Sequence, residues 1–188
     1  MPIASLVNPD PVDQRDQALR RLTGDLNQFL AARSDFIRHA MQLRGGWEGW
    51  AQVELALFLS ACGYDVEREA NIFADANRRI DLLIGWQGQF LGLEVKCETA
   101  AGAAGFYAEV DADLTKIVEQ GPRCSAGQLI FGREAALTTM WNQLSMQGVD
   151  GQRLRRLTCG ERDGLKWMIC CWPPAVQIAP AGGLPWRP

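Results

Sequence analysis

Histidine is almost missing from this sequence, and its scarcity removes several classes of enzyme. The 188 residues include one histidine, His39. Zinc sites with paired histidines and Ser-His-Asp triads are therefore excluded unless His39 itself is the base.

Long apolar runs are missing as well. No stretch approaches the roughly 20 apolar residues that span a bilayer. Residues 1–16 lack the basic start and apolar run of a signal peptide. We therefore expect no membrane association and a cytoplasmic location.

A net positive charge is the third absence. The formal net charge is -3 and the pI is about 5.2. Proteins that bind nucleic acid through bulk charge are strongly basic. Any contact with phosphate groups must therefore come from local basic patches, and bound metal ions would have to neutralise part of the substrate charge.

Cysteine is present, but no C-x-x-C pair occurs. A chain of this length with 47% hydrophobic residues can build a core without disulfides. We expect reduced thiols, while an even number of cysteines keeps a disulfide-bearing interaction protein as a third, weaker interpretation. The six positions are Cys62, Cys97, Cys124, Cys159, Cys170 and Cys171.

Hydrophobic periodicity and turn signals predict alternating helices and strands. We expect an extended arm over residues 1–14 and a hairpin turn over residues 85–88, with Gly63 capping the second helix. A polar loop rich in Arg and Gly precedes the last strand. The expected helices are 13–42, 47–61, 106–120 and 134–146, and the expected strands are 64–69, 79–84, 89–97, 128–131 and 165–172.

This order predicts one α/β domain. Three antiparallel strands followed by a helical crossover give a mixed central sheet with helices on its faces. We expect an N-terminal arm and helix over residues 1–42, packed on a core of residues 43–175. Residues 176–188 form a Pro/Gly-rich tail.

Charged side chains interrupt two of the apolar strands. Side chains alternate between faces along a strand, so Glu94 and Lys96 point the same way while Leu93 and Val95 point into a core. If the neighbouring strands pair as a hairpin, Asp81 lies beside Glu94. Two adjacent carboxylates repel, and a divalent cation such as Mg²⁺ or Mn²⁺ would remove that penalty.

Glu54 is a fourth anomaly, on the second helix. Its neighbours at three and four residues are Trp50, Ala51, Leu57 and Phe58, so the pattern places it on the apolar stripe. A buried, unpaired glutamate costs several kcal/mol. A metal ion or the Lys96 ammonium would offset that cost.

Each of these residues also has an ordinary structural explanation. Glu94 and Lys96 alone are typical of the exposed face of an edge strand. Asp81 alone suits a strand end, and Glu54 alone suits a helix surface. Their joint occurrence in the order helix, strand, strand favours a shared active site.

Glu54, Ile80-Asp81 and Glu94-Val95-Lys96 together resemble the PD-(D/E)XK nuclease superfamily, with its restriction-endonuclease-like fold. The resemblance covers about residues 47–172, and Ile80 stands where the proline of the motif would be. It implies an αβββαβ core, here with an extra N-terminal helix. The helix with Glu109, Asp113 and Lys116 also resembles the one that follows the catalytic strand in toxin-type members.

The resemblance implies a role for each matching residue. Asp81, Glu94 and the backbone carbonyl of Val95 would hold the metal ion, Mg²⁺ or Mn²⁺. Lys96 would position or activate the attacking water. Glu54 would orient the metal shell or help to bind a second ion.

Arginines provide candidate phosphate contacts. Arg78 and Arg79 directly precede the Asp81 strand, so the chain itself places them near the expected metal. A second group lies in the late polar loop, where substrate contact and a solvated surface are equally good interpretations. Its members are Arg153, Arg155, Arg156 and Arg162.

The sequence therefore predicts a Mg²⁺-dependent nuclease, with DNA favoured over RNA as its substrate and partner. The catalytic set would be Glu54, Asp81, Glu94 and Lys96, with Arg78 and Arg79 binding substrate. If the protein is a toxin, an immunity or inhibitor protein is a further expected partner. The alternative is a catalytically inactive binding or scaffold protein with the same fold.

Overall fold

The computed structural model describes residues 11–43, 46–99, 103–119, 122, 124–144, 148–149, 152–153 and 155–171. Within these residues, four helices flank a six-stranded mixed sheet, and a separate two-stranded ribbon is present. The chain therefore has the α/β class that its sequence predicts.

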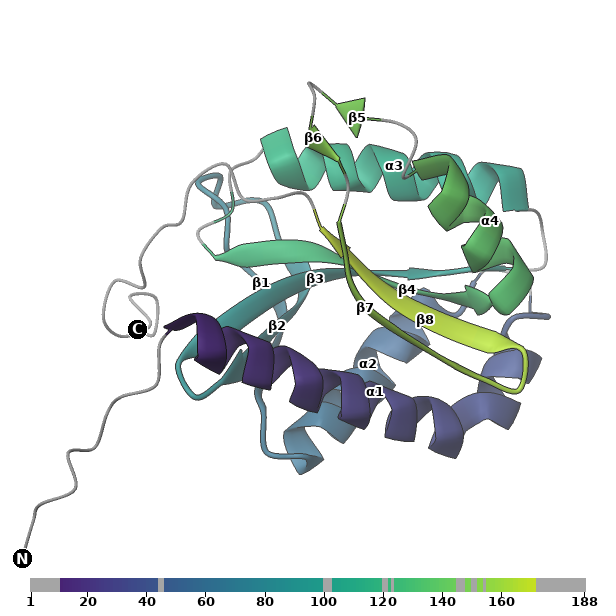
Figure 1. Cartoon of the computed structure of the whole chain (residues 1–188), viewed down its shortest axis with the longest axis horizontal. Helices are drawn as coiled ribbons and strands as arrows, with labels where there is room; N and C mark the ends of the chain where they lie inside the picture. The colour runs from purple at the N-terminus through teal and green to yellow at the C-terminus, as the bar shows by residue number, and fades with distance from the viewer. Residues whose placement is uncertain are drawn as a thin grey trace, which may run out of the picture.

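The helices form two layers, one on each side of the sheet (Figure 1). Buried side chains of the first two helices share one apolar cluster, and those of the last two share another. The helices are α1 (Pro11–Ala40), α2 (Glu48–Ala61), α3 (Ala103–Glu119) and α4 (Glu134–Leu144).

The main sheet has the strand order β1-β2-β3-β4-β8-β7. Neighbouring strands are antiparallel except β3 and β4, which are parallel and joined through α3. The strands are β1 (Asp65–Ala70), β2 (Ile80–Trp86), β3 (Gln89–Cys97), β4 (Ser125–Arg133), β7 (Arg155–Arg162) and β8 (Leu165–Cys171); β5 (Gly148–Val149) and β6 (Gln152–Arg153) form the ribbon. A parallel pair requires a crossover of this kind, so the order of elements determines the mixed sheet.

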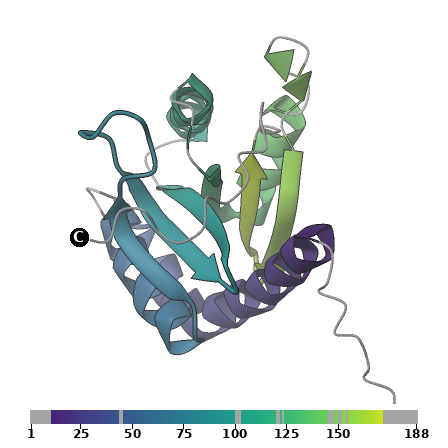
Figure 2. The ribbon, with the colours of Figure 1, turned by 90° about the vertical axis from the view of Figure 1, so that its left-hand side faces the viewer.

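Alternation along the strands divides the core between the two faces of the sheet. Leu93, Val95 and Leu129 pack against α1 and α2. Ile130 and Met168 pack against α3 and α4. Figure 2 shows α1 and α2 lying along one side of the curved sheet, with α3 on the other side.

Two local turns follow from glycine at the required positions. Gly63 has φ +89 and ends α2, with its N–H donating to Ser60 and the N–H of Tyr64 donating to Leu59. These two bonds are those of a Schellman cap. Gln87 and Gly88 both have positive φ and join β2 to β3 as a type I′ hairpin turn.

The structure corrects the sequence prediction in two segments. The predicted loop before the last strand contains β7, which pairs with β8 along the edge of the sheet. Residues 11–14 of the predicted extended arm are the first turn of α1, because proline is compatible with the start of a helix. Residues 1–10 of that arm and the predicted 176–188 tail lie outside the described residues.

Two further expectations concern thiols and membranes. Cys62, Cys97, Cys124 and Cys159 carry free thiols, so a three-disulfide framework is absent. Among the described residues, no helix combines the length and the apolar character needed to cross a bilayer.

Candidate active site

Asp81 and Glu94 lie side by side on adjacent strands, as the hairpin prediction required. Leu82 pairs with Leu93 in the antiparallel register of β2 and β3, and one further step places Asp81 opposite Glu94. Opposed residues of an antiparallel pair share a face. Here that face is the α3 side, because Leu83, two residues after Asp81, packs with Ile117 of α3.

The Asp81 carboxylate is fixed by the backbone of β3. Its Oδ2 accepts a hydrogen bond of 2.7 Å from the Val95 N–H. The N–H and C=O of one strand residue point to the same side of the strand, so the Val95 carbonyl also lies on the β2 side. The predicted carbonyl ligand and Asp81 thus occupy the same edge of β3.

Burial and like charge act together on the Glu94 carboxyl. Burial raises its pKa to about 7, and the neighbouring Asp81 charge adds to the rise while Lys96 opposes it. Burial also raises the pKa of Asp81, against the lowering effect of the Val95 N–H. Two adjacent carboxyls that resist ionisation form a site that a cation would stabilise.

Lys96 is held between two carboxylates from different helices. Its Nζ lies 2.9 Å from Asp113 Oδ2 on α3 and 3.5 Å from Glu48 Oε1 on α2. Burial lowers the pKa of Lys96, but the Asp113 hydrogen bond and the Glu48 charge outweigh burial and raise it overall. Lys96 is therefore a permanent cation at neutral pH, suited to donating hydrogen bonds rather than accepting a proton.

Asp113 links Lys96 to a second lysine. Lys116, one turn further along α3, also pairs with Asp113. Burial raises the pKa of Asp113, but the hydrogen bonds from Lys116 and Lys96 lower it overall. A carboxylate held ionised in this way fixes the position of the Lys96 ammonium.

Glu54 does not join this group through the contacts of the described residues. Its Oε2 pairs with Arg33 Nε of α1 at 3.0 Å. Glu48, six residues earlier and about 120° away around the helix axis, is the α2 carboxylate that reaches Lys96. The expectation for Glu54 is therefore replaced by one for Glu48, because α2 turns Glu54 toward α1 instead of toward the strand charges.

The candidate phosphate-binding arginines lie on the surface. Arg78 and Arg79 are exposed in the loop before β2. Arg79 donates to the carbonyls of Ala76 and Arg78, and Arg78 pairs with Asp75 at 3.6 Å. The later group lies on strands rather than in the predicted loop: Arg153 is in β6, and Arg155, Arg156 and Arg162 are in β7.

Three functional candidates are not among the site residues that the sequence predicts. Glu48 shares a helix face with the buried Ala51, Gln52 and Leu55, a spacing of three, four and seven residues that was available as a signal. Asp113 enters the sequence prediction only as part of its helix. Gln128, inside the mostly apolar β4, carries no signal beyond being polar.

The donor set is consistent with Mg²⁺ or Mn²⁺ more than with zinc or calcium. Mg²⁺ is usually held by one or two carboxylates, with water and substrate phosphates completing its shell. Asp81 and Glu94 supply two such carboxylates. Among the described residues, no group of three or more acidic, histidine or cysteine side chains is placed to coordinate one metal ion. Any ion bound by Asp81 and Glu94 would therefore take its other ligands from water or substrate.

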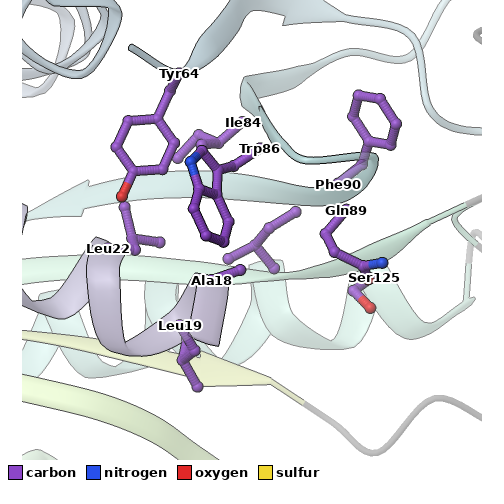
Figure 3. A pocket seen from close by; sticks show the side chains of 10 residues that line it. Ala18, Leu19, Leu22, Tyr64, Ile84, Trp86, Gln89, Phe90 and Ser125 are labelled. Carbon is purple, nitrogen blue, oxygen red and sulfur yellow. The ribbon is translucent and has the colours of Figure 1, made fainter. Parts of the chain in front are cut away.

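The cavity shown in Figure 3 lies away from these charges. Its wall includes Leu22, Tyr64, Ile84 and Trp86, on the α1 face of the sheet. Glu94 and Lys96 lie on the opposite face. The cavity is mostly apolar, and its lining includes none of the carboxylates that characterise the candidate active site.

Comparison with models of known families, with curated proteins and with solved structures finds no match.

Proposed function

We propose that this protein is a metal-dependent phosphodiesterase. More particularly, we propose a Mg²⁺-dependent nuclease of the PD-(D/E)XK superfamily, with a restriction-endonuclease-like fold and DNA as the favoured substrate. The observation that supports this proposal is the convergence of Asp81, Glu94 and Lys96 on one face of the β2-β3 hairpin.

Each residue has a role that follows from its surroundings. Asp81 and Glu94, with the Val95 carbonyl, would hold the cation, which supplies positive charge to a phosphodiester and lowers the pKa of water. Lys96 stays protonated, so it orients the nucleophilic water and compensates the negative charge on the phosphoryl oxygens. Glu48 and Asp113 hold the Lys96 ammonium in place.

Phosphate binding would come from exposed cations beside the hairpin. Arg78 and Arg79 precede β2 by two residues and one residue, respectively, and remain our candidates for contacts to the nucleic-acid backbone. With a net charge of -3, the protein would bind nucleic acid through such a local patch and its metal ion.

The alternative is a non-catalytic binding module with the same fold. A binding module would retain nucleic acid or a protein partner without cleaving it.

Digestion of plasmid DNA and of structured RNA separates the two functions. We expect wild-type protein to cleave with Mg²⁺ or Mn²⁺ and to be inactive with EDTA. Lys96→Ala should lose at least about 100-fold of the rate, a typical loss for removal of one electrostatic donor.

Lys166→Ala is the matched control, because Lys166 also has a mostly covered side chain, 12% exposed, and pairs with Glu161 of β7, beside the turn that joins β7 to β8. It should cleave like wild type. Failure of the wild type to cleave any DNA or RNA with either metal would favour the binding module instead.

A further inference from the structure

Gln128 of β4 carries a buried amide for which the described part of the chain offers no hydrogen-bond partner. Its side chain is completely covered, and neither its amide nitrogen nor its amide oxygen has a partner among the described residues. A buried amide without partners is costly, because it loses its bonds to water and gains none in return. A buried polar group without a hydrogen-bond partner is rare in native structures and requires an explanation.

The sheet register places this amide beside the candidate metal site. Gln128 pairs directly with Glu94 in the parallel register of β3 and β4. Its neighbours Ala126 and Ile130, on the same face of β4, pack in the clusters beneath α3. Gln128, Glu94 and Asp81 therefore form one row across three adjacent strands, on the face that Lys96 and Asp113 also share.

An amide has two advantages over other side chains at this position. The site already contains the carboxylates of Glu48, Asp81, Glu94 and Asp113, so another acid would add repulsion. A second lysine beside Glu94 would compete with a cation for that carboxylate. A neutral N–H donor can hold one carboxylate oxygen while the other remains available to a metal ion.

We propose that Gln128 is a positioning residue whose amide N–H hydrogen-bonds the Glu94 carboxylate when Glu94 binds a divalent cation. This inference rests on the proposed function and deepens it. A carboxylate that ligates a metal is generally held by a second hydrogen bond of this kind, which fixes its orientation. The missing partner of the buried amide is thus supplied by the cation-bound arrangement of Glu94.

The test compares Gln128→Met with wild type. Methionine has a similar length and no hydrogen-bonding amide, so unfolding in urea with EDTA should show equal or greater stability. Titration with Mn²⁺, followed by calorimetry, should show a dissociation constant about 10- to 100-fold weaker. Cleavage at low Mn²⁺ should fall similarly and should recover at saturating Mn²⁺.

Gln52→Met is the matched control. Gln52 is also buried, but its Oε1 accepts a hydrogen bond from Arg68 at 3.3 Å. This variant should lose stability while its Mn²⁺ affinity stays within about twofold of wild type, because a partnered structural amide has been removed.

The outcomes separate this inference from the proposed function. Unchanged Mn²⁺ affinity in Gln128→Met, with wild type binding and cleaving normally, would refute the positioning role alone. A clear loss of stability in Gln128→Met would also refute it, since the amide would then have a structural partner. A wild type that neither binds Mn²⁺ nor cleaves would overturn both.

Discussion

At the scale of single residues, the site is defined by how its charges are neutralised. Lys96 is matched by Asp113 and Glu48, whereas Glu94 faces Asp81 with only partial compensation from Lys96. A substitution that disturbs the lysine should therefore affect the reaction, and one that disturbs the carboxyl pair should affect cation binding and stability.

Asp113→Asn tests the first half of this distinction. The neutral amide leaves the Lys96 ammonium with Glu48 as its remaining carboxylate partner at hydrogen-bonding range, so the ammonium is less well positioned. We expect kcat to fall about 10- to 100-fold with Mn²⁺ affinity nearly unchanged. Steady-state kinetics and calorimetry measure the two quantities separately.

Asp111→Asn, on the same helix, is the control and should retain wild-type kinetics. An equal loss of kcat in both variants would show that α3 tolerates no change of charge, and the specific role of Asp113 would be withdrawn.

Glu94 makes the stability of the metal-free protein depend on pH. Because burial and Asp81 raise its folded-state pKa to about 7, the folded protein binds more protons than the unfolded chain between the ordinary glutamate pKa and that value. The stabilisation that comes from protonating Glu94 is therefore present at low pH and is lost as the pH rises toward 7 and above.

Glu94→Gln should remove this dependence. In EDTA, we expect the variant to be more stable than wild type at pH 8, with a smaller difference at pH 5. Urea denaturation at both pH values gives the free energies of unfolding. A wild-type advantage at pH 8 would contradict the proposed crowding of carboxyls.

At the scale of elements, α2 shows both what the sequence could predict and where it could not. The position of the helix was predicted within one residue, because Trp47, Gly63 and the apolar run between them mark its ends. The buried face of the helix could not be predicted, because apolar residues occur almost all around it. Leu57, which the pattern places on the core stripe with Glu54, is 64% exposed. The spacing of Glu48 from Ala51 and Leu55 is a signal in the sequence, but only the packing of α1 decides between Glu48 and Glu54.

Paired substitutions in α2 test this assignment. Glu48→Gln removes a carboxylate that touches Lys96, so we expect slower cleavage. Glu54→Gln removes the ion pair with the partly exposed Arg33, so we expect unchanged cleavage and a stability loss of less than about 1 kcal/mol. Both rates are measured on plasmid at saturating Mg²⁺. The reverse pattern would restore Glu54 to the site and remove Glu48.

The edge strand β7 was missed for a related reason. Its sequence, RRLTCGER, has charged residues at both ends and a glycine inside, which is a composition typical of a loop. Edge strands are often charged, because charge discourages pairing with another chain. In contrast, β2 and β3 lie inside the sheet and are nearly continuous apolar runs, so their charged residues were conspicuous.

At the scale of the whole molecule, strand order connects residues that are distant in the sequence. The antiparallel trio and the crossover could be predicted, and with them the meeting of Asp81 and Glu94. The direct pairing of Gln128 with Glu94 could not, because it depends on the register of a parallel pair separated by α3. The approach of Glu48 and Asp113 to Lys96 from two different helices likewise depends on packing.

The same architecture predicts how the whole fold responds to a divalent cation. Binding to the folded protein alone stabilises it, and at a free metal concentration tenfold above Kd the gain is about 1.4 kcal/mol. For a domain of this size, that corresponds to a rise in Tm of roughly 3–6 °C. We expect this rise with Mn²⁺ or Mg²⁺ in a thermal melt, and its reversal by excess EDTA.

The metal-induced rise should disappear in Asp81→Asn, which removes one anionic ligand, and should persist in Lys96→Ala, which leaves both carboxylates in place. Removing the lysine charge has two effects that oppose each other. Without metal, the carboxylates repel more strongly because a compensating cation is lost; with metal, they attract the bound cation more strongly because no lysine competes for them. We therefore expect Lys96→Ala to be less stable in EDTA and to show a larger gain from Mn²⁺ than wild type. A rise of equal size in all three proteins would indicate that the metal binds elsewhere, and Asp81 and Glu94 would then be only a repelling pair in the fold.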